Sequence, residues 1–141
     1  MNRLRHLRKR NKFTLNDIAK QLNLSTTQVY KLERHQSELK EKYIVFFCYL
    51  YKCTPNYLLG LDDDDRIVEI KEMKLQLKEI RKAKKLKQKD LTQILNIKKQ
   101  QAHLYENNQS QLTESQIKIL CEHLETNANY LLGLKEKENK I

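Results

Sequence analysis

Glycine, proline and tryptophan are nearly absent from this chain: 2 Gly, 1 Pro and no Trp among 141 residues. Tight turns between β-strands rely on glycine and proline, so this scarcity excludes a sandwich or barrel built from many hairpins. Lys, Gln, Leu and Glu, which favour helices, are abundant instead. The composition therefore predicts an all-α protein.

Cysteine and long apolar runs are scarce too. Cys48, Cys53 and Cys121 form no CxxC pair, which favours free thiols in the core of a protein from a reducing compartment over disulfides or a metal site. The most apolar stretch, residues 43–51, is far shorter than the roughly 20 residues of a membrane span, and no signal peptide opens the chain. We expect a cytoplasmic protein without a cofactor or metal.

Catalytic groupings are missing as well. The chain has no phosphate-binding loop and no paired acids in an apolar setting, and its four histidines are dispersed. Glu33 and Glu106 are candidates for acid–base chemistry because they occupy equivalent places in the two halves of the chain. A single such Glu in each half favours a structural role instead. We predict that the protein is not an enzyme.

Basic residues, in contrast, are in excess. There are 28 Lys and Arg against 18 Asp and Glu, a net charge of +10 that is concentrated in residues 1–61. Such a charge favours a polyanionic partner. The acidic run at 62–65 is the exception, and we interpret it as a solvated helix cap rather than a cation site, because the Gly and Glu of a calcium loop are missing.

A repeat organises the whole chain. Asn-Tyr-Leu-Leu-Gly-Leu occurs at 56–61 and again at 129–134. At this offset residues 4–61 align with 77–134 without a gap, and about 21 of some 58 pairs are identical. We predict two tandem domains, residues 1–61 and 77–134. The linker at 62–76 is expected to be acidic and then helical, merging with the next helix because residues 67–85 contain no breaker, and residues 135–141 form a charged tail.

Each repeat is expected to contain five helices. In the first repeat Thr14 and Ser25 are N-caps, Asn23 is a left-handed stop, Thr54 and Pro55 open the fifth helix, and Gly60 ends it. The second and third helices are then joined by a turn of three to four residues. This is the spacing of a helix-turn-helix, whose second helix can enter the major groove of DNA.

Several segments carry a family resemblance. They are Leu-Arg-His-Leu-Arg-Lys at 4–9, Thr-Leu-Asn-Asp-Ile-Ala-Lys-Gln-Leu-Asn-Leu-Ser at 14–25, Val-Tyr-Lys-Leu-Glu-Arg at 29–34 and the closing Asn-Tyr-Leu-Leu-Gly. Together they resemble the DNA-binding domain of phage Cro and repressor proteins, the xenobiotic-response-element type. The resemblance implies a five-helix, lambda-repressor-like fold and binding of double-stranded DNA. It predicts a transcriptional regulator of bacterial or phage type, with repression as the expected effect.

The family reads bases from the start of its third helix. For the first repeat this implies that Gln28 can pair with adenine and Lys31 with guanine, while Ser25 caps the helix and binds a phosphate. The other contacts implied in this repeat come from Thr26, Thr27 and Tyr30 at the groove and from Arg8, Lys9 and Lys12 at the DNA backbone.

The second repeat departs from this pattern. Lys98 replaces the capping Ser25, Thr92 replaces Ala19 at the helix crossing, and Leu104 replaces Lys31. Its candidate DNA contacts are Lys98, Lys99, Gln100, Gln101 and His103. Alternatively, this repeat serves packing or dimerisation. For the whole chain the alternative is a protein-binding module, such as an antitoxin or antirepressor, that uses its helix-turn-helix surfaces for a protein partner.

The fourth helix of the first repeat is apolar on all sides, unlike its counterpart in the second. Such a helix is buried on more than one side. We predict that Val45, Phe46, Tyr49 and Leu50 form an interface, either with the second repeat or with another copy of the chain in a homodimer. The alternative, a larger core within the first repeat, is less favoured because a domain of about 60 residues has little interior.

Overall fold

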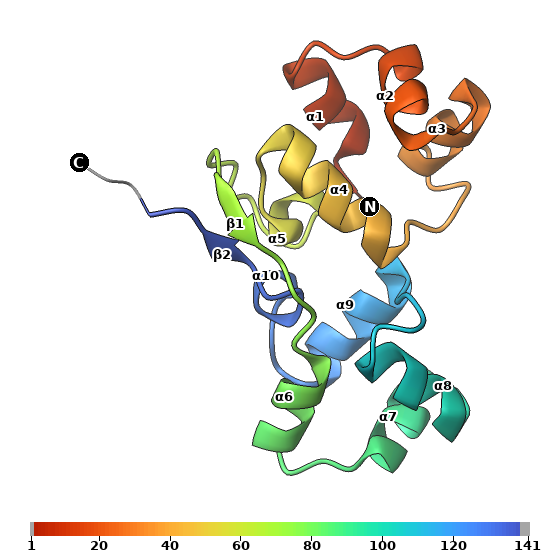
Figure 1. The fold of residues 1–141 in the computed structure, drawn as a ribbon, viewed down its shortest axis with the longest axis vertical. Coiled ribbons are helices and arrows are strands. Elements are labelled where there is room, and N and C mark those ends of the chain that lie inside the picture. The colour runs from red at the N-terminus through yellow and green to blue at the C-terminus, as the bar shows by residue number, and fades with distance from the viewer. Residues whose placement is uncertain (1, 139–141) are drawn as a thin grey trace.

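The computed structural model describes residues 2–138 of the chain. The first half contains α1 (Leu4–Arg10), α2 (Leu15–Leu22), α3 (Thr26–Glu33), α4 (Glu41–Tyr51) and α5 (Pro55–Leu58). The second half contains α6 (Leu77–Ala83), α7 (Gln88–Leu95), α8 (Lys99–Glu106), α9 (Glu114–His123) and α10 (Ala128–Leu131). Figure 1 shows α1–α3 at one end of the long axis, α6–α8 at the other, and the remaining helices between them.

The helix boundaries follow the capping residues. The Thr14 hydroxyl accepts a hydrogen bond from the Asp17 N–H, and the Asp17 carboxylate accepts one from the Thr14 N–H, which makes a capping box at the start of α2. Asn23 ends α2 in the left-handed conformation at φ 55°, and Thr54 caps α5 by accepting from the Tyr57 N–H. The predicted helix starts and stops are therefore confirmed at these positions.

Left-handed backbone recurs at equivalent places in the two halves. Among residues 2–138, the positive-φ residues form pairs 73 positions apart, namely Lys12 and Lys85, Asn23 and Asn96, His35 and Asn108, Lys52 and Glu125, and Gly60 and Gly133. This conformation costs roughly 1–2 kcal/mol for a residue with a side chain, so its recurrence indicates that both halves follow the same chain path.

The predicted helix over residues 67–85 is wrong for its first part, since α6 begins only at Leu77. Strand β1 (Ile70–Glu72) lies in the linker and pairs antiparallel with β2 (Lys135–Glu136) of the charged tail. Val68 and Ile70 are buried whereas Glu69 is exposed, and this alternation is the period of a strand rather than a helix. The all-α prediction therefore holds apart from this two-stranded sheet.

We expected the acidic run to cap a helix. This is wrong, because the residues directly after it, 66–69, are not helical. Its groups instead bind arginines: the Arg3 guanidinium donates to the Asp62 carbonyl and to the Asp63 carboxylate, at 2.6 and 2.8 Å. Arg66 pairs with Asp64 at 3.0 Å. The run thus holds the start of the linker against the N-terminal end of the chain.

The three cysteines lie buried in the hydrophobic core, and burial raises the pKa of Cys48 and raises that of Cys121 to about 11. The core includes buried residues of both halves and of the linker, where Val68 and Ile70 belong to it. Within residues 2–138 no helix is long and apolar enough to cross a membrane.

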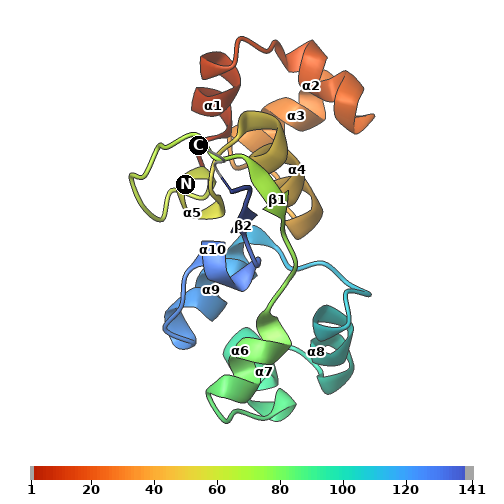
Figure 2. The ribbon, with the colours of Figure 1, turned by 60° about the vertical axis from the view of Figure 1, so that its left-hand side comes forward.

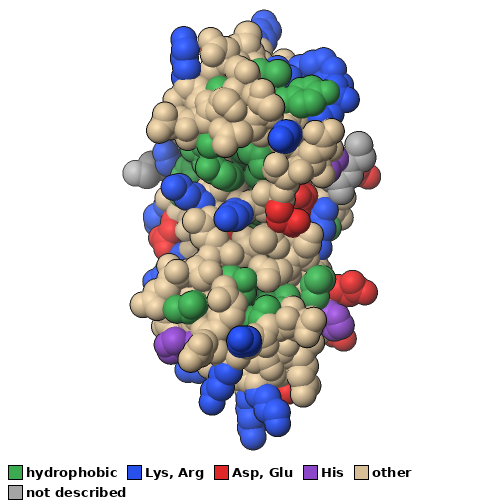
Figure 3. Space-filling view, turned by 90° about the vertical axis from the view of Figure 1, so that its right-hand side faces the viewer, with side chains coloured by type: hydrophobic (Ala, Val, Ile, Leu, Met, Phe, Trp, Pro, Cys, Tyr) green, Lys and Arg blue, Asp and Glu red, His purple; other side chains and the backbone are tan. Residues whose placement is uncertain are grey.

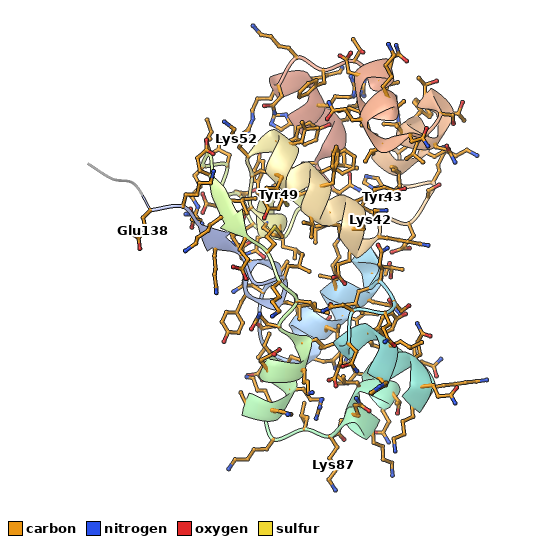
Figure 4. The ribbon with its side chains drawn as sticks, in the orientation of Figure 1. Lys42, Tyr43, Tyr49, Lys52, Lys87 and Glu138 are labelled. Atoms are coloured by element: carbon orange, nitrogen blue, oxygen red, sulfur yellow. The ribbon has the colours of Figure 1, made fainter. Side chains whose placement is uncertain are left out.

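The two halves meet at the N-terminal ends of α4 and α9. The Glu41 N–H donates to the Leu112 carbonyl at 2.8 Å, and the Glu114 N–H donates to the Leu39 carbonyl at 2.7 Å. Figure 4 places Lys42 and Tyr43 beside α9, at this end of α4. Figure 2 shows the same meeting of the halves from another side.

The predicted interface residues lie farther along α4. Val45, Phe46 and Leu50 are half-buried, and Tyr49 is 44% exposed. The hydrogen bonds between the halves use other residues, so the docking role of these four side chains stays a prediction. Tyr49 lies toward the end of α4 that runs beside β1 (Figure 4).

Candidate nucleic-acid interface

Helices α2 and α3 pack closely across a short turn. Ala19, at 4% exposure, lies where they cross, and its carbonyl accepts from the Leu24 N–H at 2.9 Å. Val29 and Leu32 on the inner side of α3 are buried in the core. The small residue at the crossing and the left-handed Asn23 together let α3 lie across α2 in a helix-turn-helix.

Helices α7 and α8 repeat this arrangement despite the larger Thr92. The Thr92 hydroxyl donates to the Lys89 carbonyl at 2.6 Å, and the Thr92 carbonyl accepts from the Ile97 N–H at 3.0 Å. Because its hydroxyl is bonded within its own helix, Thr92 leaves no unpaired donor at the crossing. The second half therefore keeps the same turn.

The predicted reading residues of the first half share one exposed side of α3. Tyr30 is 42% exposed and lies under the Arg34 guanidinium, 5.0 Å from the ring centre. None of the group is acidic, and all are exposed: Ser25, Thr26, Thr27, Gln28, Tyr30 and Lys31. The structure thus brings these six residues together on the solvent side.

The Gln28 side chain also caps the start of α3, a role that we did not predict from the sequence. Its Oε1 accepts from the Ser25 N–H at 2.8 Å, while the Ser25 hydroxyl accepts from the Gln28 N–H at 3.1 Å. This is a capping box, and Ser followed three residues later by Gln is its known sequence signature. A bidentate contact with adenine uses both the oxygen and the nitrogen of the amide, so Gln28 Oε1 would have to leave the Ser25 N–H or accept from the base with its second lone pair.

The exposed side of α8 differs in chemistry. Lys98, at the N-cap, makes no side-chain capping bond, and Lys99, Gln100 and His103 are exposed. Gln101 is half-buried and donates through Nε2 to the Ser110 hydroxyl at 3.0 Å. Four of the five predicted contacts of the second half are therefore exposed, although the His103 ring also lies 3.2 Å from Asn107 Nδ2, and Gln101 is held toward its own loop.

Arg8 lies in a structural ion pair rather than on an open surface. Its guanidinium donates to both carboxylate oxygens of Glu33, at 2.7 and 3.2 Å, and to the Phe13 carbonyl at 3.0 Å. The Arg8 and Glu33 side chains are only 11% and 4% exposed. Lys9 and Lys12, in contrast, are exposed.

The same ion pair occurs in the second half. Arg81 donates to both oxygens of Glu106, at 2.6 and 3.2 Å, and to the Leu86 carbonyl at 2.8 Å. Burial alone would raise the pKa of Glu106, but hydrogen bonds from Arg81 and Gln88 outweigh it and lower that pKa. The hydrogen bonds that Arg8 donates to the Glu33 carboxylate raise the pKa of Arg8. The structural role predicted for the two glutamates fits these contacts.

The sequence contains a signal for the Arg–Glu pair. Both members are identical in the two repeats at the 73-residue offset, although most surface positions differ. Within residues 2–138 the structure brings no three His, Cys, Asp or Glu side chains together as a metal site.

Helices α3 and α8 lie on the same side of the molecule, toward opposite ends of its long axis (Figure 1). Figure 3 looks onto this side: Lys and Arg side chains are scattered over both ends and over the middle, where acidic side chains lie among them.

A comparison with protein families identifies one segment of the chain. Residues 77–131, which comprise α6 to α10, match the family model described as Helix-turn-helix. No curated protein and no solved structure matches the chain. The resemblance of residues 4–61 to the same family stays a prediction. The family that residues 77–131 match comprises DNA-binding regulator domains of the Cro/C1 type, which are generally not enzymes.

Proposed function

We propose that this protein is a sequence-specific DNA-binding transcriptional regulator that represses by occupying an operator. One observation carries the proposal: the family match falls on α6–α10, and the first half repeats the same helices and left-handed turns. We infer from this that both halves are helix-turn-helix domains and that α3 and α8 are the recognition helices. Such a regulator acts inside the cell, and its partner is double-stranded DNA.

In the first half, the start of α3 is the proposed reading surface. Ser25 and the free N–H groups at the helix start bind a phosphate, while Thr27, Tyr30 and Lys31 lie at the groove. Lys31 is the proposed guanine contact. Gln28 keeps its capping bond to Ser25 and offers only its Nε2 group to a base acceptor.

Lys9 and Lys12 are the proposed contacts to the DNA backbone from this half, because both are exposed. Arg8 is removed from that group, since its guanidinium binds Glu33 and the Phe13 carbonyl. In the second half Lys98 and Lys99 contact phosphates, and Gln100 and His103 lie at the groove.

The salt dependence of binding to a random-sequence duplex pool tests the proposal. Contact with roughly 4–8 phosphates gives a slope of about −4 to −7 for log affinity against log salt. Several rounds of selection from the pool should then enrich a defined sequence. A chain that binds no duplex DNA at low salt is not a DNA-binding regulator, and the alternative, a module for a protein partner, is then preferred.

A further inference from the structure

The contacts between the two halves are reciprocal. Glu41 and Glu114 are equivalent in the two repeats, and so are Leu39 and Leu112. The Glu41 N–H donates to the Leu112 carbonyl, and in return the Glu114 N–H donates to the Leu39 carbonyl.

Bonds from backbone to side chain show the same symmetry, because residues 42 and 115 are equivalent, as are 38 and 111. The Lys42 N–H donates to Gln111 Oε1 at 3.0 Å, and the Ser115 N–H donates to Glu38 Oε1 at 2.8 Å. Exchanging the two repeats therefore reproduces these four bonds, whereas the weaker bond from the Leu112 N–H to Glu41 Oε1, at 3.4 Å, has no counterpart.

Two positions meet their own counterparts. Lys40 and Thr113, which are 73 positions apart, form an isolated antiparallel bridge. The Asn56 N–H donates to Asn129 Oδ1 at 2.8 Å, and the Asn129 N–H donates to Asn56 Oδ1 at 3.2 Å. In a symmetric pair only residues on the two-fold axis meet their own equivalents, so the axis passes through both places.

One deviation from this symmetry has a covalent cause. Asn56 Oδ1 also accepts from the Ala128 N–H at 2.8 Å, and the reverse bond, from residue 55 to Asn129, does not occur. Residue 55 is Pro55, which has no N–H to donate. The junction is therefore the self-complementary surface of a two-fold dimer, with its two copies linked in one chain.

We propose that a single chain acts as a covalently linked two-fold dimer, and that it binds one DNA site composed of two inverted but unlike half-sites. The proposal rests on the DNA-binding function proposed above. A two-fold axis between the halves gives α3 and α8 opposite directions along the duplex, as in a dimeric repressor whose half-sites are inverted. Here one chain supplies both recognition helices.

The half-sites differ because the recognition helices differ. Lys31, a cation that binds guanine, corresponds to the half-buried, apolar Leu104. Tyr30 corresponds to His103, and Ser25 to Lys98. The identical pair, Gln28 and Gln101, is held by different partners, the Ser25 N–H and the Ser110 hydroxyl. An identical sequence in both half-sites would suit only one of the two helices.

Selection of bound duplexes by the full-length chain provides the first measurement. We expect two unlike, inverted half-sites with centres about 10–10.5 base pairs apart, or a multiple of this spacing. The mass of the purified complex, measured by light scattering, should correspond to one chain for each duplex. A palindrome occupied by two chains would overturn the linked-dimer proposal and leave the DNA-binding function standing, whereas the absence of any binding would remove both.

The spacing of the half-sites provides a second measurement, which leaves the protein unchanged. Inserting 5 base pairs between them turns one half-site to the opposite side of the duplex, where a rigid pair of helices cannot reach it. Affinity should fall by about 10²–10⁴-fold, to that of a duplex carrying one half-site, because the second contact loses its high effective concentration. An insertion of 10 base pairs restores the rotation but moves the half-site by roughly 34 Å, so a rigid pair should lose the second contact here as well.

Two substitutions assign the half-sites. Lys31→Ala should relax base preference in one half-site only, and His103→Ala in the other half-site only. An unchanged affinity after the 5-base-pair insertion, or both substitutions acting on the same half-site, would refute the proposal.

Discussion

At the scale of single residues, the Arg8–Glu33 and Arg81–Glu106 pairs connect the first helix of each half to its third, α3 or α8. Each arginine binds a buried glutamate at the end of that helix and a carbonyl in the turn after its own helix. The glutamate side chains are 4% and 0% exposed, so each charge is compensated locally rather than by water. These pairs fix where α3 and α8 lie.

Arg8→Ala should therefore affect folding before it affects DNA. Removing one partner of a buried ion pair leaves an uncompensated charge and costs about 3–5 kcal/mol. Thermal melting should show this loss in the first half. The matched control is Lys9→Ala, which alters an exposed neighbour: its melting temperature should stay unchanged while its affinity for all DNA sequences falls. An Arg8→Ala protein that melts like the wild type would contradict the structural role.

Glu106 makes the stability of the folded protein depend on pH in the acidic range. Its pKa is lowered in the folded state, so its stabilising contribution is fully present above the unfolded value of about 4.3 and is lost as the pH falls through the folded pKa. Melting curves from pH 6 to pH 3 should show falling stability. Glu106→Gln should be less stable at pH 6 but lose less on acidification. Glu122→Gln, at an exposed position of α9, is the control, and an equal acid response in all three proteins would refute the assignment.

At the scale of elements, local signals were sufficient for the helices and insufficient for the strands. Thr14 and Asn23 delimit α2 through bonds within four residues of themselves, which can be read from the sequence. Strand β1 exists because Ile70 lies opposite Glu136, and nothing in residues 67–76 specifies that distant partner. A run without helix breakers and with apolar residues at helical spacing was therefore misread as a helix.

The candidate site was predictable to a similar extent. The exposed side of α3 follows from helix periodicity, because Val29 and Leu32 must face the core and leave Thr27, Tyr30 and Lys31 outside. The ion pair of Arg8 joins residues 25 positions apart, so only the tertiary fold brings them together. The capping bond of Gln28 is local, and its sequence signature was available.

The recognition helix itself gives a prediction on specificity. Lys31 is exposed on α3 and is the proposed guanine contact. Lys31→Ala should cost about 1–3 kcal/mol on the preferred sequence and relax the requirement at one base pair. Competition among duplexes that vary one position at a time measures this. Lys20→Ala, which removes an exposed charge from α2, should weaken all duplexes alike or not at all, and a loss of base preference there would point to a different reading surface.

At the scale of the whole molecule, the linked-dimer proposal implies that one chain supplies both halves of the DNA-binding pair. The apolar positions of α4 are then not required to recruit a second copy. Val45 is half-buried and Tyr49 is 44% exposed, toward the end of α4 that lies beside β1 (Figure 4). We therefore expect the free protein to be monomeric, with these side chains stabilising the chain that carries them.

The double substitution Val45→Asp with Tyr49→Asp tests that expectation. A carboxylate at the half-buried position 45 should cost about 1–3 kcal/mol, because its hydration is reduced there, whereas the exposed position 49 should add little. Light scattering should give a monomer before and after the change, and thermal melting should show the loss. Glu122→Ala with His123→Ala, on the exposed and already polar side of α9, should change neither quantity. A wild-type dimer that becomes a folded monomer in the variant would instead show that α4 binds a second copy, and unchanged stability would mean that these side chains support neither contact.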